Sequence, residues 1–519
     1  MWVIKILVLS FTLLSIFSCS KIEKQNVKNI LVYLFAGGKS HTFILMELIK
    51  NTSDRMKIEN PNTKYVFHVL VHEVDKDLWK KIEDYQEYFK LYVFGDVNIF
   101  MEKFLAAFAF EKDNKLFGHS KLYEYEISLY EEFFNSNLLE KIKETKYDLI
   151  ITDFVNFLPP FLRRELKIEK MMYLNPTCKI NYWYLANMEY NAAYEPFEAT
   201  HFKDEMSFFE RLQNFFIKIA NEIILYRSIQ IHNKPFIERG YEPVNPYQPH
   251  SIYLNQCVDG VHFPMSLPPN FIFTGAFLPK PPNPLPDGEL NTFLSKYKKN
   301  IYVGQGTMAK SIVFEEIVDI FNHFPDYGFI FSIRNDTALT IPLPKNVLGV
   351  HWTPQNDLLG DKRLHGFITH GGLNSILESI YHAKPMIVLG TFIDQVNGAV
   401  LVKTRKYGIG FTSESSITKE GIIEAIHELM TNPIYSQEIL KGSEIVREKS
   451  GRDSFYYWLH YVLEYGYEHL IIPGFENYSR FQMYNFDVLC VVFIMVIIFV
   501  CLFFWIIYKM IGLCVNKKN

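Results

Sequence analysis

Short apolar runs alternate with amphipathic segments along two separate stretches of the chain. In the first stretch, the apolar run 29–36 passes through Gly37-Gly38 into a helical segment that continues to Ile49. Further strands are expected at 65–71 and 148–152. In the second stretch, the same alternation predicts strands at 300–303, 328–333, 347–350 and 366–369. Strands that alternate with helices predict a parallel sheet, so each stretch is expected to form a Rossmann-like α/β domain.

A proline-rich segment separates the two stretches. Five prolines fall between Pro279 and Gly288, which is typical of a stiff, extended linker. The sequence therefore predicts one domain over 21–278 and a second over 289–470, with a last helical segment at 454–469. Two domains also suit a chain of 519 residues, which is too long for one ordinary hydrophobic core.

Apolar segments at both ends of the chain indicate a membrane route. An apolar run follows Lys5, and small residues at 18–20 complete the pattern of a cleaved signal peptide. Residues 488–508 carry no charge and are long enough to cross a bilayer core of about 30 Å. Basic residues follow this span, as expected on the cytosolic side of a single-pass, type I protein. The expected order at the two ends is a signal peptide at 1–20, a juxtamembrane segment at 471–487, a transmembrane helix at 488–508 and a cytosolic tail at 509–519.

Charge and cysteine content narrow the classes of partner and site. The formal charge of −4 provides no basic surface, so nucleic acid is not expected as a partner. Of the six cysteines, only Cys178 and Cys257 fall in the folded part, which allows at most one internal disulfide and leaves its formation open. No residues have the spacing of a metal site. Glycosylation sequons at Asn51, Asn335 and Asn477 fit a secretory route.

A glycine pair in the second stretch is placed to hold an anion. Gly371 and Gly372 stand between the expected strand 366–369 and a helix at 373–382, whose apolar residues repeat with a period of 3.6. Without Cβ atoms, the backbone N–H groups can approach a phosphate closely, and the helix terminus adds positive potential. A tight turn is the usual explanation for such a pair, but the residues that follow favour a ligand.

Polar residues around this turn indicate a nucleotide-sugar. Asn374 and Glu378 are four residues apart and share one helix face, where a carboxylate can accept hydrogen bonds from a ribose diol. Trp352 can stack on a planar base, although a single tryptophan more often belongs to a core. Asp394 and Gln395 offer partners for the hydroxyls of a sugar. The joint order of these residues is what favours ligand binding over the structural explanations.

This segment resembles the signature of the UDP-glycosyltransferases of the UDP-glucuronosyltransferase superfamily, which are inverting enzymes of the GT-B fold. The matching residues are Trp352, Pro354, Gln355, Asp357, Leu358, Leu359, Phe367, Thr369, His370, Gly371, Gly372, Asn374, Ser375, Glu378, Pro385, Asp394, Gln395 and Asn397. The resemblance is strong in the second stretch and weak before residue 270. One departure is Asp361-Lys362, where animal members usually have His-Pro, and it puts the shape of that loop in doubt.

The resemblance implies a role for each residue that contacts the donor. Trp352 and Gln355 would hold the uracil, and His370 the diphosphate. Glu378 would hold the ribose, and Asp394 with Gln395 the transferred sugar. Gly306 and Thr307, in a glycine turn after the strand 300–303, would lie beside the diphosphate. The same turn fits a dinucleotide fingerprint only weakly, because no acidic residue closes the next expected strand.

Sugar transfer with inversion needs a base that removes the acceptor's proton, and histidine has a suitable pKa. His41 follows the first glycine turn, at the carboxyl end of a strand where ligands approach an α/β sheet. Asp153 follows the strand 148–152 and could orient the imidazole. Both match the family's catalytic pair in local context. The alternative for His41 is a capping or surface histidine.

The resemblance implies a membrane-anchored, metal-independent transferase that moves a hexose or glucuronic acid from UDP-glucose or UDP-glucuronate to a small lipophilic acceptor, without a bound cofactor. Family members of this shape reside in the endoplasmic reticulum with lumenal catalytic domains, and homo-oligomers are possible. The alternative is a catalytically silent relative that binds a lipophile or a partner. A nucleotide-sugar oxidoreductase is disfavoured because the first stretch lacks a suitable catalytic Cys or Tyr-x-x-x-Lys placement. Aromatic residues reach 16% and concentrate before residue 270, which an acceptor pocket and a bias of composition explain equally well.

Overall fold

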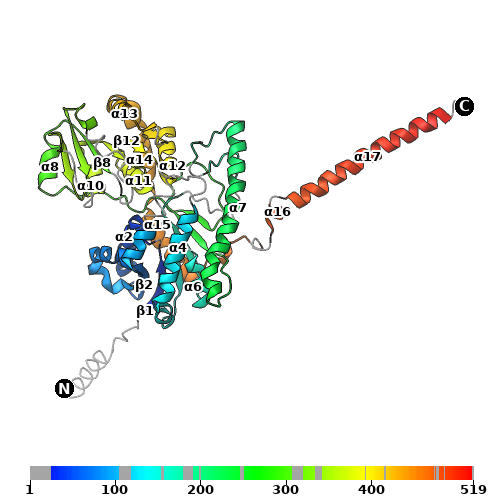
Figure 1. Ribbon diagram of the computed structural model, residues 1–519, viewed down its shortest axis with the longest axis horizontal. Coiled ribbons are helices and arrows are strands. Elements are labelled where there is room, and N and C mark those ends of the chain that lie inside the picture. The colour runs from blue at the N-terminus through cyan, green and yellow to red at the C-terminus, as the bar shows by residue number, and fades with distance from the viewer. Residues whose placement is uncertain are drawn as a thin grey trace, which may run out of the picture. The chain divides into compact units, whose positions relative to one another are not determined.

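The computed structural model divides the chain into two compact units, Met1–Glu468 and His469–Asn519 (Figure 1). The structure describes residues 25–516 apart from internal gaps. These gaps are 35, 105–118, 154–156, 179–190, 198–199, 246–249, 305, 307–318, 334–341, 392, 414–415, 473, 475–477 and 484. The expected signal peptide at 1–20 lies outside the described residues.

The first half of the first unit is built on a parallel sheet. Among the described residues this sheet has seven strands in the order β3-β2-β1-β4-β5-β6-β7. The strands are β1 (Asn26–Tyr33), β2 (Thr63–His72), β3 (Phe89–Phe94), β4 (Leu149–Thr152), β5 (Met171–Asn175), β6 (Ile252–Asn255) and β7 (Phe271–Phe273). The helices of this half are α2 (Lys39–Glu59), η1 (Glu73–Tyr88), α4 (His119–Asn135), α5 (Leu138–Lys143), α6 (Leu158–Glu165) and α7 (Phe208–Glu238).

The second half repeats the architecture with a smaller sheet. Its described part has six parallel strands in the order β10-β9-β8-β11-β12-β13. They are β8 (Lys299–Gly304), β9 (Tyr327–Ser332), β10 (Val347–Val350), β11 (Leu364–Thr369), β12 (Met386–Leu389) and β13 (Gly408–Phe411). The helices are α8 (Glu289–Leu294), α10 (Gln355–Gly360), α11 (Leu373–Tyr381), α12 (Ile393–Thr404), α13 (Lys419–Thr431) and α14 (Pro433–Glu448).

Continuous apolar runs form these strands because helices cover both faces of a parallel sheet. Residues of β1 such as Ile30, Leu31 and Val32 have no exposed surface, and β12 is buried from Met386 to Val388. Each sheet therefore supplies a rigid platform, and the loops at the carboxyl ends of the strands carry the polar residues discussed below.

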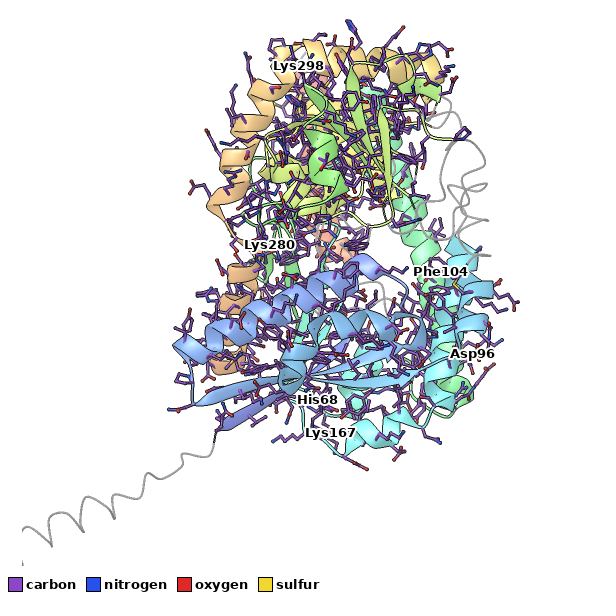
Figure 2. The ribbon with its side chains drawn as sticks, turned by 90° about the vertical axis from the view of Figure 1, so that its left-hand side faces the viewer. His68, Asp96, Phe104, Lys167, Lys280 and Lys298 are labelled. Atoms are coloured by element: carbon purple, nitrogen blue, oxygen red, sulfur yellow. A yellow bond between two sulfur atoms is a disulfide. The ribbon has the colours of Figure 1, made fainter. Side chains whose placement is uncertain are left out.

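The last helix of the first unit, α15 (Gly451–Tyr465), returns from the second half to pack on the first. The hydroxyl of Tyr65 lies 2.9 Å from Nδ1 of His460, and Asn60 donates to the hydroxyl of Tyr456 at 3.2 Å. In the linker, Lys280 forms an ion pair with Glu47 of α2 at 3.3 Å, where the two halves meet (Figure 2). These contacts join the two α/β halves within one unit.

The second unit contains η3 (Glu468–Leu470, which begins at the last residue of the first unit), α16 (Arg480–Met483) and the long helix α17 (Phe486–Asn516). Residues Phe486–Met510 are long and apolar enough to cross a membrane, with a mean hydropathy of 3.3. This candidate span includes the whole of the expected 488–508 segment. The end of the tail, 517–519, lies outside the described residues.

The fold belongs to the α/β class that the sequence predicts, and several details are added. Strands β3, β5, β6, β7 and β13 were not predicted. Cys178 and Cys257, whose pairing the sequence left open, form a disulfide with Cα atoms 4.9 Å apart. The sequon at Asn51 lies inside α2 with Thr52 and Ser53 buried, which is unlike a surface acceptor loop. The other two sequons involve residues outside those described.

Candidate functional site

The ends of two neighbouring strands bring His41 and Asp153 together. β1 and β4 pair in parallel, with Tyr33 opposite Thr152, so the segments that follow them leave the sheet side by side. Nδ1 of His41 lies 2.9 Å from Oδ2 of Asp153. The Asp153 side chain is fully buried, and that of His41 is 15% exposed. A buried carboxylate thus fixes an imidazole that still reaches solvent, which is the arrangement predicted from sequence.

Buried side chains hold the turn that carries His41. The N–H of Gly37 donates to Oδ2 of Asp75 at 2.6 Å, and the hydroxyl of Tyr125 donates to the carbonyl of Ala36 at 2.9 Å. Gly37 has φ +71°, and a Cβ there would lie 2.3 Å from the ring of Phe100. Burial raises the pKa of Asp75, although the Gly37 hydrogen bond opposes the rise. Sequence reasoning missed Asp75 because only the tertiary fold brings η1 to this turn.

The second half contributes an open helix terminus. Gly371 has φ +95°, and a Cβ there would lie 2.6 Å from Val388, so only glycine fits. Gly372 caps α11 without a side-chain hydrogen bond. A Cβ at Gly306 or Gly372 would come within 2.4 or 2.6 Å of the His370 ring, so both backbones lie against this imidazole. Burial lowers the pKa of His370 to about 4, which keeps the ring neutral at physiological pH.

A hydrogen-bonded cluster lies one turn further along α11. Nε2 of Gln355 donates to a carboxylate oxygen of Glu378 and, at 3.2 Å, to the hydroxyl of Ser375. The hydroxyl of Tyr302 donates to Oε1 of Gln355 at 3.4 Å. Burial raises the pKa of Glu378 to about 7 despite the Gln355 hydrogen bond. The structure therefore brings Gln355, Ser375 and Glu378 together, as the sequence predicts.

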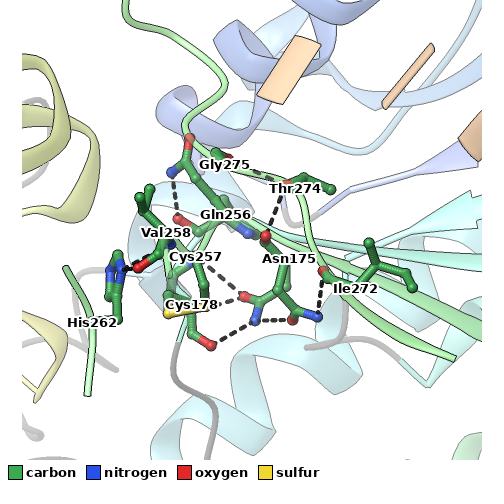
Figure 3. Close-up of a disulfide and its surroundings, with 12 residues drawn as sticks. Asn175, Cys178, Gln256, Cys257, Val258, His262, Ile272, Thr274 and Gly275 are labelled. Atoms are coloured by element: carbon green, nitrogen blue, oxygen red, sulfur yellow. Dashed lines mark hydrogen bonds between the residues drawn. A yellow bond between two sulfur atoms is a disulfide. The ribbon is translucent and has the colours of Figure 1, made fainter. Parts of the chain in front are cut away.

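Asn374 makes a contact that sequence could not show. Its Oδ1 accepts a hydrogen bond from Nε2 of Gln256 at 2.7 Å, and Gln256 follows β6 in the first half. Oε1 of Gln256 also accepts from the N–H of Phe277 at 2.9 Å. Figure 3 shows Gln256 beside the Cys178–Cys257 disulfide. Asn374 thus connects helix α11 to the first half through its side-chain oxygen.

Asp394 and Gln395 lie in the first turn of α12. Burial raises the pKa of Asp394 to about 6, and the charge of His41 lowers it. The Asp394 carboxyl in the second half therefore interacts electrostatically with the imidazole in the first. Oε1 of Gln395 accepts weak hydrogen bonds from the N–H and hydroxyl of Thr391, both at 3.4 Å. The two predicted sugar-binding residues therefore lie together at the start of α12.

Trp352 is available for stacking, since 67% of it is exposed. Two residues of the first half contact it: Nζ of Lys81 lies 4.3 Å from the ring centroid, and the Phe43 ring lies at a centroid distance of 6.1 Å. Neither Phe43 nor Lys81 was predicted as a site residue, because no local pattern marks them. They extend the candidate uracil site to both halves of the unit.

A pocket with an empty volume of about 500 Å³ lies beside Asp394. Thr177, Cys178, Phe263 and Met265 line it from the first half, and residues around Gly371 and Asp394 line it from the second. Most of its exposed lining is apolar, so it suits a lipophilic molecule next to the predicted sugar site.

The remaining predicted features are outside this cluster or undescribed. Gly306 adopts φ +75° next to His370, whereas Thr307 lies outside the described residues. At the departure from the family pattern, Asp361 accepts from the backbone of Arg363 at 2.8 Å and pairs with its guanidinium at 2.7 Å. This ion pair closes the turn before β11. In the part of the chain that the structure describes, no three His, Cys, Asp or Glu side chains cluster as metal ligands would.

Comparisons with known proteins agree with this geometry. A family model described as "UDP-glucoronosyl and UDP-glucosyl transferase" matches residues 100–519. UDP-glucuronosyltransferase 3A1 of Xenopus laevis is 27% identical over 381 residues, which is 70% of this chain and 72% of that protein. Human 2-hydroxyacylsphingosine 1-beta-galactosyltransferase is 25% identical over 68% of this chain and 66% of its own length.

Solved structures show the same fold at low sequence identity. A UDP-glucose: anthocyanidin 3-O-glucosyltransferase in complex with UDP superposes with a TM-score of 0.57 at 15% identity, covering 85% of this chain and 99% of that one. The glycotransferase of kitacinnamycin gives a TM-score of 0.58 at 16% identity, covering 84% and 100% of the two chains. These likenesses establish the GT-B architecture of two facing α/β domains.

Proposed function

Because the chain belongs to the UDP-glucoronosyl and UDP-glucosyl transferase family and its activity is sugar transfer from a UDP-sugar, we propose that transfer proceeds with inversion and that His41, oriented by Asp153, is the general base. The observation that carries the proposal is the 2.9 Å contact between the His41 ring and a fully buried carboxylate. Asp394, a predicted sugar-binding residue, interacts electrostatically with the same side chain.

In the proposed reaction, a neutral His41 removes the acceptor's hydroxyl proton as that oxygen attacks the anomeric carbon. The bond between this carbon and the UDP oxygen breaks from the opposite side, which inverts the configuration. Asp153 stabilises the imidazolium that forms, because a buried carboxylate interacts strongly with an adjacent positive charge. The proton remains on His41 until it passes to solvent, to which this side chain is partly open.

The departing UDP would be stabilised by the N-terminus of α11, where Gly371 and Gly372 leave the backbone N–H groups accessible. His370 stays uncharged because burial lowers its pKa, and its hydrogen bond to the backbone of Gly304 would hold the ring beside the diphosphate. Glu378 would accept hydrogen bonds from the ribose, and Trp352 with Gln355 would hold the uracil. Preorganised backbone dipoles perform the task that a divalent ion performs in other transferases, so we expect the reaction to need no metal.

The acceptor is proposed to be a small lipophilic alcohol, phenol or acid. The apolar lining of the pocket beside Asp394, which includes Phe263 and Met265, supports this class. The candidate span Phe486–Met510 supports a single membrane anchor. We expect the first unit to face the lumen of the endoplasmic reticulum, as the signal-peptide pattern and the basic tail favour.

A panel of UDP-sugars and phenols, offered to the detergent-solubilised full chain, tests the proposal. We expect His41→Ala to lose turnover by about 100-fold or more, in the range of general-base catalysis, while calorimetry shows unchanged UDP affinity. The matched control is His427→Ala on the exposed surface of α13, which should keep full activity. Equal turnover in His41→Ala would remove His41 from the mechanism. Retained UDP binding without turnover of any sugar by the native chain would identify a silent relative.

A further inference from the structure

Helix α7 buries a polar side chain and exposes several large apolar ones. In its N-terminal half, Asn214 is fully buried, and its amide donates to the carbonyls of Ala192 and Glu195 at 3.0 and 2.8 Å. Its Oδ1 accepts from the N–H of Phe197 at 2.8 Å. Several large apolar side chains lie on another face of the helix and are exposed. A polar residue thus attaches the helix to the fold, while its hydrophobic face points outward.

The outward face is continuous. At 100° per residue, the eight exposed large apolar residues between Phe208 and Tyr226 fall within an arc of about 120°. No charged or polar residue in that interval shares the arc, and each side chain is between 39% and 77% exposed. The residues of this outer stripe are Phe208, Phe209, Leu212, Phe215, Phe216, Ile219, Ile223 and Tyr226. In Figure 1, α7 runs along the outside of the first unit.

An exposed apolar surface of this size marks a contact with a partner or a membrane. The stripe is too broad for the narrow seam of a two-helix coiled coil, since adjacent pairs such as Phe208-Phe209 and Phe215-Phe216 both point outward. Broad aromatic and aliphatic faces are typical of helices that lie in a membrane interface. Between Ser207 and Arg227 the charges nearly cancel, with Arg211, Lys218 and Arg227 against Glu210 and Glu222.

The chain itself brings a bilayer within reach. The span Phe486–Met510 follows the end of the first unit at Glu468 after only 17 residues, 469–485. Even a fully extended connection of this length reaches about 60 Å. A bilayer is therefore an obligatory neighbour of the first unit, whereas a second copy of the chain would have to be encountered by diffusion.

We propose that the outer stripe of α7 inserts into the interface of a zwitterionic phospholipid bilayer, as a second membrane contact separate from the span. The near-neutral charge of the helix means that apolar burial, and not attraction to anionic lipids, provides the binding. The proposal rests on the proposed membrane anchoring. The proposal also accounts for part of the high aromatic content of the first half, because the aromatic residues of the outer stripe face outward and do not line an acceptor pocket.

Photo-cross-linking in the full chain tests this contact. The protein is reconstituted in phosphatidylcholine nanodiscs that contain a lipid with a diazirine at mid-chain, and labelled peptides are mapped by mass spectrometry. We expect lipid adducts on residues 208–226 as well as on 486–510. The variant Phe209→Gln/Phe216→Gln/Ile223→Gln should lose at least about fivefold of the α7 adducts and keep those of the span. The control Ile58→Gln, at an exposed but isolated apolar residue of α2, should change neither.

The outcomes separate this inference from the anchor. Adducts on the span without adducts on α7 would overturn the inference and leave the anchor intact. Absence of adducts on both would overturn the anchor and the inference together. In a parallel sample treated with an amine-reactive cross-linker, cross-links between the α7 segments of two copies, found in place of lipid adducts, would also overturn it, in favour of a second copy. Unchanged UDP affinity of the triple variant confirms that it is folded, because no residue of the outer stripe belongs to the predicted donor site.

Discussion

Replacing Glu378 by Gln should stabilise the protein and at the same time lower its affinity for UDP. Burial raises the pKa of Glu378 from its ordinary value of 4.5 to about 7, so the fold opposes ionisation of this carboxyl. At 1.36 kcal/mol per pH unit, the cost of ionising it above pH 7 is about 3 kcal/mol. Such a cost suits a residue whose charged form is needed for a ligand and not for the fold.

The dependence on pH follows from the sign of the shift. Below pH 4.5 the Glu378 carboxyl is protonated in both the folded and the unfolded chain, so it does not change the free energy of unfolding. Between pH 4.5 and about 7 the unfolded chain ionises first, so stability falls as pH rises. Because glutamine does not ionise, the Glu378→Gln variant does not lose stability in this pH range. The variant should therefore match the native chain in acid and exceed it in unfolding free energy by up to about 3 kcal/mol above neutral pH.

UDP binding should change in the opposite direction. Loss of hydrogen bonds from the ribose to a carboxylate costs about 1.5–3 kcal/mol, or about 10- to 150-fold in affinity. In the native chain, affinity should also fall about tenfold between pH 8 and pH 6, as Glu378 becomes protonated. The variant should show only the weaker dependence that comes from the phosphate of UDP itself, which makes it the matched control.

Thermal unfolding measured from about pH 5 to about pH 8, together with calorimetry of UDP binding, checks both effects. The reasoning is refuted if Glu378→Gln is less stable than the native chain above neutral pH. It is also refuted if the variant binds UDP as tightly as the native chain, because Glu378 would then not contact the ribose.

Two further substitutions test how the site is positioned. Gly371→Ala should weaken UDP binding by at least about tenfold and lower the melting temperature, because the new Cβ would lie 2.6 Å from Val388 in a backbone with φ +95°. Calorimetry measures the affinity, and thermal unfolding measures the melting temperature. Values like those of the native chain would contradict the prediction. Asp75→Ala should lower kcat by about 10- to 100-fold with UDP affinity unchanged, since it releases the Gly37 turn before His41. Asp75→Asn, which still accepts the Gly37 hydrogen bond, should recover most of that loss, and equal kcat in both variants would show that the bond does not position His41.

Local patterns predicted the features that depend on neighbouring residues. The glycine turn, the helix Leu373–Tyr381 and the strand Val347–Val350 follow from periodicity and turn chemistry, which are visible in a short window. The His41–Asp153 pair was also predictable, since both residues follow strands of one parallel sheet and such strand ends meet at the same edge. Strands β6 and β7 were missed because no amphipathic helix follows either of them directly to mark an alternation of strand and helix.

The contacts that cross the two halves could not be predicted. Gln256 meets Asn374 although 118 residues separate them, and Lys81 reaches Trp352 from a helix with no signature of its own. Such pairs depend on how two sheets face each other, and no spacing in the chain encodes that. They are also the contacts through which the first half can influence donor binding, so the signature in the second half describes only part of the site.

Helix α7 shows a different limit of sequence patterns. A period of 3.6 identifies an apolar face, and in most soluble proteins that face is directed to the core. Here the buried hydrogen bonds of Asn214 fix the opposite face against the fold. The period is the same in both cases, so periodicity alone cannot give the direction. The direction is decided by the side chain that needs hydrogen-bond partners. The Asn214 amide makes three hydrogen bonds to backbone groups, so it must face the protein that supplies them. The phenylalanines on the opposite face of α7 are then directed away from the fold.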